Sequence, residues 1–317
     1  MAFILRRVVV GYLQSHPGEQ FTAREIALWT MATYPTEAAA KKARAHQNLE
    51  SDADLEQQWA AEIGAAWPLL RDQHHGLKIT EGRPRKYYYS EKSEIDEVKE
   101  AEGGLVVTPG APGESKLSEA QLYPLLAAYL REDLGMRSKR IDEKTSSNGR
   151  GPAGNRWLHP DVVALEDLGK AWSTEVKDCA KQLGDTRTRL WSFEVKLLIN
   201  RSNVRETYFQ AVSNSSWANF GYLVAAQIAG SGGHDDTMKE LRMLAAAHGI
   251  GVILLHGDAP SESEMLIPAR ERTGIDWDTA NRLAEENADF RLYLQLVTKY
   301  NQAGGAELLG WDVVPAG

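Results

Sequence analysis

"LWSFEVKLLIN", residues 190–200, has the composition of a buried strand but carries two charged residues. Most of its side chains are apolar, and Glu194 and Lys196 interrupt the run. Side chains of a strand alternate between the two faces of a sheet, so Glu194 and Lys196 share one face. A buried carboxylate is costly unless it is paired or binds a metal. The stretch therefore predicts a local ion pair or a functional site.

A Glu-x-Lys tripeptide alone is a weak signal, because the chain holds a second copy at residues 175–177. Asp161, in "HPDVVAL", precedes another short apolar run and could accompany either copy. The stretch around residues 175–177 has helical periodicity, whereas that around Glu194 is strand-like and leads into a helix. We therefore favour Glu194 and Lys196, and keep Glu175 and Lys177 as the alternative.

The order Pro160-Asp161, strand, Glu194-Val195-Lys196, helix resembles the PD-(D/E)xK nuclease superfamily. The resemblance implies that Asp161, Glu194 and the backbone carbonyl of Val195 bind Mg²⁺, a hard cation that prefers oxygen ligands. Mn²⁺ is expected to substitute for it. Lys196 would orient or activate a water molecule and neutralise charge on the phosphate.

Two further positions match the nuclease pattern. The superfamily often uses a glutamate in the helix before the first strand, for which Glu119 is the candidate and Glu132 the alternative. Some members carry a glutamine in the helix after the Glu-x-Lys strand, and Gln210 stands there. Glu119 and Gln210 could equally be polar surface residues of amphipathic helices.

From residue 117 onward, helix-like and strand-like segments alternate. Strands without polar alternation, separated by helices, indicate a parallel sheet covered on both faces. The nuclease resemblance implies a restriction-endonuclease-like α/β/α domain with a central mixed sheet over residues 117–317. Residues 276–303 have the pattern of two helices, which start near Asp276 and Asn287. We therefore predict the α/β class for this part of the chain.

Residues 1–90 have the pattern of helices followed by a short hairpin. One apolar stripe recurs at spacing four in "DADLEQQWAAEIGAAWPLL", at Leu55, Trp59, Ile63 and Trp67. Two strand-like runs then flank the turn "EGRPR" at residues 81–85. Helices with a basic two-stranded wing are typical of a winged helix-turn-helix, and the stretch resembles the HARE-type winged helix. A helical protein-interaction module is the alternative.

Five basic residues are candidates for contacts to DNA phosphates: Arg83, Arg85, Lys86, Arg201 and Arg205. The first three lie in the wing, and the other two follow the Glu-x-Lys strand. A basic cluster can also be an ordinary solvated surface. The formal net charge of −8 argues against a protein that binds nucleic acid with its whole surface, although local patches decide binding.

Residues 91–116 are charged and then rich in Gly, Pro and Ser, which predicts a linker with at most a short helix. No apolar run approaches the roughly 18 residues that a membrane helix needs. The single cysteine, Cys179, is consistent with a reducing cytoplasm. We therefore expect a cytoplasmic protein with no membrane partner.

The sequence of most of the C-terminal part, preceded by a stretch that resembles a HARE-type winged helix, is similar to that of the HrgA-like bacterial proteins. That resemblance implies a DNA endonuclease in restriction or anti-phage defence, with a cognate methyltransferase as a candidate partner. One active site per chain would favour a homodimer for a double-strand cut. The alternative function is a non-catalytic DNA-binding regulator with a relic nuclease fold.

Overall fold

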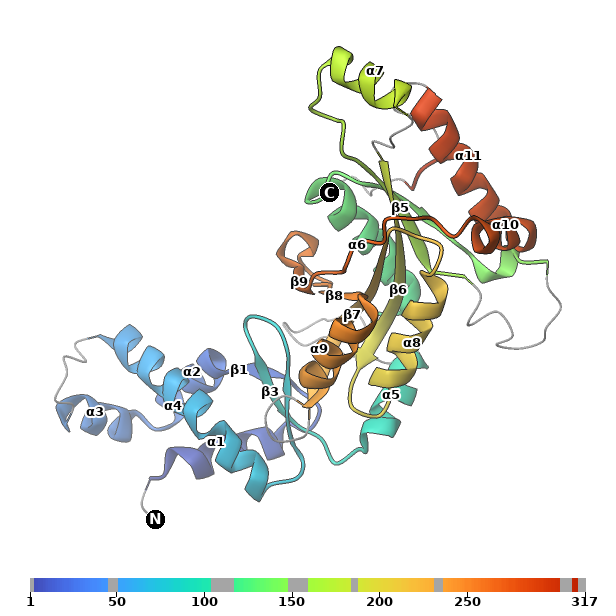
Figure 1. The fold of residues 1–317 in the computed structure, drawn as a ribbon. Helices are drawn as coiled ribbons and strands as arrows, with labels where there is room; N and C mark the ends of the chain where they lie inside the picture. The colour runs from blue at the N-terminus through green and yellow to red at the C-terminus, as the bar shows by residue number, and fades with distance from the viewer. Residues whose placement is uncertain are drawn as a thin grey trace. The chain divides into compact units, whose positions relative to one another are not determined.

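The computed structural model describes residues 3–44, 51–103, 117–147, 159–183, 188–230, 236–302 and 310–312. The chain is mixed α/β and divides into two compact units (Figure 1). The first unit comprises Met1–Lys116, Asn200–Ser202 and Gln227–Lys239. The second unit comprises Leu117–Ile199, Asn203–Ala226 and Glu240–Gly317.

The first unit contains helices and a small antiparallel sheet. Its described elements are α1 (Leu5–Ser15), β1 (Phe21–Thr22), α2 (Ala23–Thr33), α3 (Pro35–Arg44), α4 (Asp52–Gln73), β2 (Leu77–Thr80), β3 (Lys86–Tyr89) and α5 (Glu94–Glu102). The strand order is β1-β3-β2, and β2 also pairs with the end of β7. Gly82, in the turn between β2 and β3, has a φ of 106°, which a glycine adopts without strain.

The predicted apolar stripe of α4 is buried in the core of this unit. Leu55, Trp59, Ile63 and Trp67 pack with α1 and α2 residues such as Leu13 and Ile26. Helix α2 begins at a capping box, in which Thr22 and Glu25 satisfy each other's backbone N–H groups. Periodicity and cap chemistry therefore account for where these helices lie.

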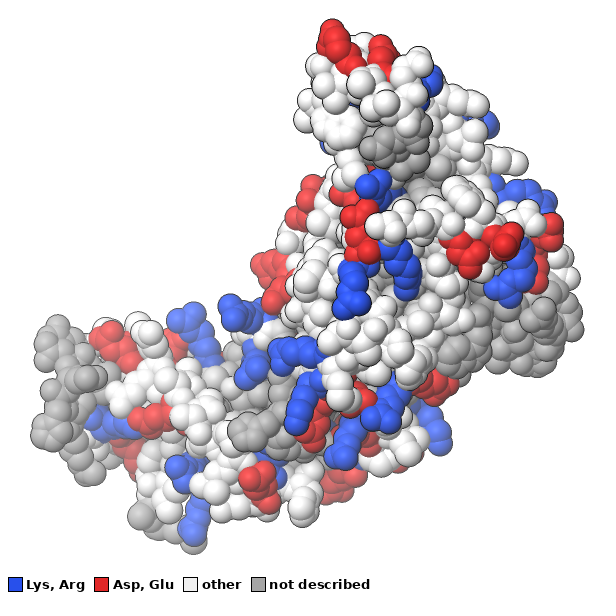
Figure 2. Space-filling view, viewed as in Figure 1, with Lys and Arg blue, Asp and Glu red and all other residues white. Residues whose placement is uncertain are grey.

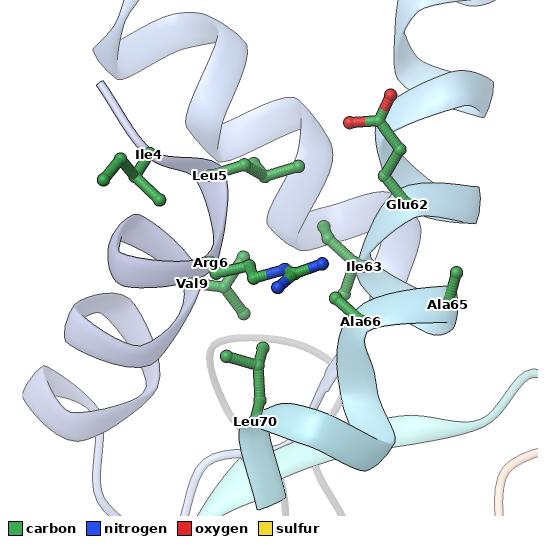
Figure 3. Close-up of a pocket in the computed structure, with 9 residues that line it drawn as sticks. All are labelled: Ile4, Leu5, Arg6, Val9, Glu62, Ile63, Ala65, Ala66 and Leu70. Atoms are coloured by element: carbon green, nitrogen blue, oxygen red, sulfur yellow. The ribbon is translucent and has the colours of Figure 1, made fainter. Parts of the chain in front are cut away.

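A pocket of about 460 Å³ lies between α1 and α4. Its walls are mainly apolar, and Figure 3 shows Arg6 of α1 extending toward Ile63 and Ala66 of α4. Glu62 of α4 also lines this pocket. The two helices thus pack closely at their buried faces and separate along one side.

Helix α5 falls within the segment that the sequence predicts to be a linker. Val98 and Ala101 of α5 are buried, and Glu97 accepts a hydrogen bond of 2.7 Å from the ammonium of Lys78 on β2. This part of the segment is therefore packed within the first unit. Residues 104–116, the rest of the predicted linker, lie outside the described residues.

The second unit is built on a longer sheet. Its described elements are α6 (Glu119–Glu132), β4 (Arg137–Arg140), β5 (Val162–Asp167), α7 (Thr174–Gln182), β6 (Thr188–Ile199), α8 (Val204–Asn214), β7 (Phe220–Gly230), α9 (Asp236–His248), β8 (Gly251–Leu254), β9 (Glu264–Ile267), α10 (Trp277–Glu286) and α11 (Ala288–Gln302). Short 3₁₀ turns occupy Glu143–Thr145 and Pro260–Glu262. The last residues of β7 and the start of α9 belong to the first unit.

The sheet is mixed, in the order β9-β8-β7-β6-β5-β4. Strands β4, β5 and β6 are antiparallel neighbours, whereas β7 and β8 are parallel and β8 and β9 antiparallel. The expectation of a parallel sheet is therefore wrong for β4 to β6, and the mixed sheet is confirmed. Apolar runs show only that a strand is covered on both faces, and they do not fix its direction.

Helices α10 and α11 pack on one face of this sheet. Phe290 and Tyr293 of α11 are fully buried in a cluster with Val163, Leu165 and Leu190 of β5 and β6. The Tyr293 hydroxyl donates to the carbonyl of Ala164 at 2.8 Å, so its polar end is satisfied inside the core. Within the described part of the chain, no helix is long and apolar enough to cross a membrane.

Candidate active site

Asp161 lies directly before β5 and against the middle of β6. Val162 pairs with Phe193, and the Asp161 backbone N–H donates to the Phe193 carbonyl at 3.1 Å. The Asp161 side chain turns toward the next residues of β6, because its Oδ2 accepts a hydrogen bond of 2.8 Å from the backbone N–H of Val195. The carboxylate is therefore fixed beside the residue that separates Glu194 from Lys196.

Glu194 and Lys196 form a buried ion pair on β6. Nζ of Lys196 lies 2.6 Å from Oε1 of Glu194, and the residues are 8% and 2% exposed. The other oxygen of Glu194 accepts a hydrogen bond of 2.8 Å from Asn214 at the end of α8. The buried carboxylate is thus satisfied by a cation on its own strand and an amide from the helix that follows.

A third carboxylate approaches from α6. Glu119 accepts a hydrogen bond of 2.5 Å from the Tyr123 hydroxyl one turn further along the helix. The Tyr123 ring lies under the guanidinium of Arg140, whose carbon is 3.6 Å from the ring centroid. Arg140, at the end of β4, in turn donates through Nη1 to the backbone carbonyl of Asp161 and lies 3.5 Å from its Oδ1. A chain of contacts therefore joins Glu119 to Asp161.

The carboxylates of the cluster shift one another's pKa values. Burial, and then the nearby Asp161 carboxylate, raise the pKa of Glu194 to about 8, and the hydrogen bonds from Lys196 and Asn214 only partly offset this. The pKa of Glu119 is also raised, by burial and then by Asp161. Several acidic groups share one poorly solvated volume here, which is an arrangement that a cation relieves.

The pKa of the Lys196 ammonium shifts upward. Burial lowers this pKa, but the carboxylates of Glu194, Asp161 and Glu119 together outweigh burial. Lys196 therefore carries its charge at neutral pH. It can bind an anion or donate a hydrogen bond, but it is poorly suited to accept a proton as a general base.

Gln210 lies on the buried face of α8, one turn before Asn214. Residues four apart on a helix lie on the same face, so Gln210 and Asn214 share the side that Asn214 turns toward Glu194. The structure thus places the predicted glutamine near the cluster and adds Asn214 as the residue of α8 that contacts it.

The other Glu-x-Lys tripeptide lies in helix α7, and no residue of that helix is buried. Glu175 is exposed, and a hydrogen bond from the Ser173 side chain lowers its pKa. Cys179 is a free, exposed thiol on the same helix. Residues 175–177 therefore have neither the strand conformation nor the buried neighbours of residues 194–196.

The predicted phosphate-binding residues are distributed over both units. Arg83 and Arg85 are exposed in the turn between β2 and β3, with Arg85 3.6 Å from Glu81, and Lys86 begins β3 half-buried. Arg201 is 3.8 Å from Asp236, in the first unit. Arg205 forms an ion pair of 2.6 Å with Glu240 in the second unit. In Figure 2, lysine and arginine side chains are interspersed with acidic ones over the visible face.

Sequence reasoning did not place three residues of the cluster beside its carboxylates: Asn214, Tyr123 and Arg140. Asn214 could have been found from its position one helical turn after Gln210. Arg140 belongs to the basic run "MRSKR". Its strand could not be predicted, because "RSKR" lacks the apolar residues that indicate a strand. Tyr123 had no signal beyond its spacing of four from Glu119.

Nearby, His159 is buried and engaged elsewhere. Its Nε2 is 2.8 Å from the Ser146 hydroxyl, and burial lowers its pKa. The Ser146–His159 contact lies just before Asp161 in the chain. In the described ranges, no group of three or more His, Cys, Asp and Glu side chains is arranged to hold a metal ion. A metal here would need carboxylates supplemented by backbone or solvent oxygens.

No known protein family, no curated protein and no solved structure matches this chain.

Proposed function

We propose that the protein is a Mg²⁺-dependent DNA endonuclease of the PD-(D/E)xK type, acting in restriction or anti-phage defence. The observation that carries the proposal is the placement of Asp161. Its carboxylate is held by the backbone N–H of Val195, between Glu194 and Lys196, at the junction of β5 and β6. A residue 33 positions away in the sequence thus joins the Glu-x-Lys tripeptide in one cluster.

The residues fit a divalent cation through their donor chemistry. Asp161 and Glu194 offer oxygen ligands, and the raised pKa of Glu194 reflects negative groups crowded in a buried volume. The carbonyl of Val195 is the third oxygen in the proposal. A cation bound there would activate water and offset the negative charge of the phosphate.

The chain's own side chains would then share the remaining work. Lys196, charged and fixed by Glu194, would orient an attacking water molecule or the phosphate. Asn214 holds the second oxygen of Glu194 and so sets the rotation of its carboxylate. Glu119 would adjust the charge of the cluster, because its own pKa responds to Asp161. Gln210 would support the α8 side of the site.

We propose the first unit as the DNA-targeting module. Its order of helices followed by the β2–β3 hairpin, with Arg83 and Arg85 exposed at the turn, supports a winged helix-turn-helix. Lys86 is half-buried, and Arg85, Arg201 and Arg205 each lie beside an acidic residue. We rank Arg83 and Arg85 first among the predicted phosphate contacts because they are exposed at the tip of the proposed wing.

A non-catalytic DNA-binding regulator is the second candidate function, and one observation favours it. Both oxygens of Glu194 accept hydrogen bonds from protein groups, and both oxygens of Asp161 lie close to protein donors. The cluster is therefore satisfied without a metal. A buried ion network with a purely structural role would look similar.

Cleavage assays separate the two candidates. Purified protein is incubated with plain and base-modified DNA in Mg²⁺, in Mn²⁺ and in EDTA, and the ends are mapped. The endonuclease proposal expects metal-dependent cuts that Asp161→Asn abolishes while the protein keeps its circular dichroism spectrum and its DNA affinity. DNA binding without cleavage on every substrate would establish the regulator instead.

A further inference from the structure

We propose that Arg140, stacked on Tyr123, is a binding site for a phosphodiester oxyanion. The inference deepens the proposed function and rests on it, because it names the group of the nucleic acid that meets this edge of the cluster. Neither residue belongs to the Asp161, Glu194 and Lys196 set. They come from β4 and α6, on the other side of Asp161.

The stack fixes the orientation of the guanidinium. Its carbon lies 3.6 Å from the centroid of the Tyr123 ring, and its Nη1 donates to the Asp161 carbonyl. The Tyr123 ring is itself held, because its hydroxyl donates to Glu119 at 2.5 Å. The guanidinium is already anchored at one face and one edge. It therefore loses little further conformational freedom when an anion binds its remaining edge.

The remaining edge of Arg140 still has donors to offer. A guanidinium carries five N–H groups, and among the described residues only those on Nη1 have hydrogen-bond acceptors. The side chain is 27% exposed, so solvent reaches it. The geometry is that of an arginine fork in which one side is engaged and the other side can take two phosphate oxygens.

Arg140 is also the more accessible of the two cations next to Asp161. The Lys196 side chain is 10% exposed, and its ammonium is bonded to Glu194. An anion that approaches Asp161 from solvent therefore meets Arg140 more readily than Lys196. Arg140 would hold the phosphate while Lys196 stays with the buried carboxylate.

Arg137 provides a matched control on the same strand. Like Arg140, it is an arginine of β4 that stacks on a tyrosine, with its guanidinium carbon 4.7 Å from the Tyr300 ring centroid. It pairs with Leu165, whereas Arg140 pairs with Val162 at the Asp161 end. Three residues along a strand span about 10 Å and reverse the face, so Arg137 is removed from the cluster.

The test measures the affinity for a short DNA duplex by fluorescence anisotropy, with Ca²⁺ replacing Mg²⁺, at several salt concentrations. We expect Arg140→Gln to weaken binding about tenfold and to reduce the slope of log affinity against log salt by about one unit, the loss of one phosphate contact. Arg137→Gln should change neither quantity. Tyr123→Leu should weaken binding while keeping the slope, because the charge remains.

A purely structural role for Arg140 predicts a different result. If Arg140 only neutralises Asp161, Arg140→Gln lowers the melting temperature but leaves the affinity and the salt slope of the folded protein at wild-type values, which overturns the inference. Arg140→Lys keeps the charge and covers the case in which the glutamine variant does not fold. A lysine has neither the fork nor the planar group that stacks on Tyr123. If Arg140→Lys binds DNA with the wild-type affinity and salt slope, the stacked-fork site is overturned.

Failure of the proposed function gives a separate pattern. If the wild-type protein binds no DNA in Ca²⁺, the inference and the endonuclease proposal both fall. If Arg140→Gln weakens binding as expected but the wild type cuts no DNA in Mg²⁺, the phosphate site stands and the catalytic proposal falls. If the wild type cuts DNA and Arg140→Gln binds normally, only the phosphate site falls.

Discussion

The same tripeptide, Glu-Val-Lys, occurs twice in this chain and takes two different structures. At residues 175–177 it lies in α7, a helix without buried residues. At residues 194–196 it lies in β6, where all three residues are buried. The two copies have identical side chains, so their chemistry differs only through backbone conformation and neighbours. The contrast makes each copy the natural control for the other.

Backbone conformation decides whether the two charges can act together with others. In a strand the glutamate and the lysine share a face, and β5 brings Asp161 to them. In a helix, residues two apart do not face each other, and no residue of α7 is buried. The residues of a short motif therefore become a candidate site only when the fold supplies the third group.

The largest expected difference between the copies is in DNA cleavage. Glu194→Gln removes a carboxylate that the proposal assigns to the cation, so we expect metal-dependent cleavage to fall about a thousandfold or more. Glu175→Gln should leave the rate unchanged. The measurement is the single-turnover rate of cutting at saturating Mg²⁺. Equal losses in both variants would break the comparison.

The next largest difference is in stability. Lys196→Met leaves Glu194 buried without its cation, and breaking a buried pair costs about 3–5 kcal/mol. Lys177→Met, on the exposed helix, should change the free energy of unfolding by no more than about 0.5 kcal/mol. Urea denaturation of both variants checks this. A loss below about 1 kcal/mol for Lys196→Met would mean that solvent reaches the pair.

The middle residue of each tripeptide gives a smaller, purely apolar difference. Val195 is fully buried and Val176 is 49% exposed. Val195→Ala removes buried methyl groups and should cost about 2 kcal/mol. Val176→Ala exchanges a β-branched residue for a better helix former and should be neutral or slightly stabilising. If the two substitutions cost the same in urea denaturation, α7 packs against a surface in solution.

The two glutamates should also titrate differently in the metal-free protein. Glu194 has a pKa raised to about 8, whereas that of Glu175 is lowered. Glu194 should therefore take up its proton at a higher pH than Glu175 does. Carboxyl ¹³C NMR, with the glutamine variants for assignment, measures both. Asp161→Asn removes a negative neighbour and should lower the pKa of Glu194, and an unchanged titration would mean that the two carboxylates do not interact.

Much of the fold was predictable because its signals are local. The α4 stripe at spacing four is buried as predicted, and the apolar runs of β6, β7 and β8 form strands. Strands β4 and β9 were missed, since "RSKR" and "EMLI" show neither a long apolar run nor clear alternation. Whether neighbouring strands are parallel or antiparallel could not be predicted from the sequence, because it depends on which strands pair across the sheet.

The candidate site was predictable to the extent that its chemistry lies in one strand. Glu194 and Lys196 could be assigned to one face from strand geometry alone, and their closeness to Asp161 followed only from a resemblance. Arg140 contacts Asp161 from β4 and Asn214 contacts Glu194 from α8, and no spacing rule links Arg140 to β6. Tertiary packing brings them together, and a single sequence does not encode it in any local pattern.

We propose that the buried Glu-Val-Lys copy binds the metal and that the exposed copy does not. Fe²⁺-directed cleavage tests it without DNA or activity: the protein is loaded with Fe²⁺, ascorbate and peroxide are added, and the polypeptide breaks are mapped by mass spectrometry. We expect breaks near residues 161 and 194–196 that excess Mg²⁺ and Glu194→Gln suppress, with none near residues 175–177. Breaks centred on residues 175–177, or a pattern that Glu194→Gln leaves unchanged, would contradict it.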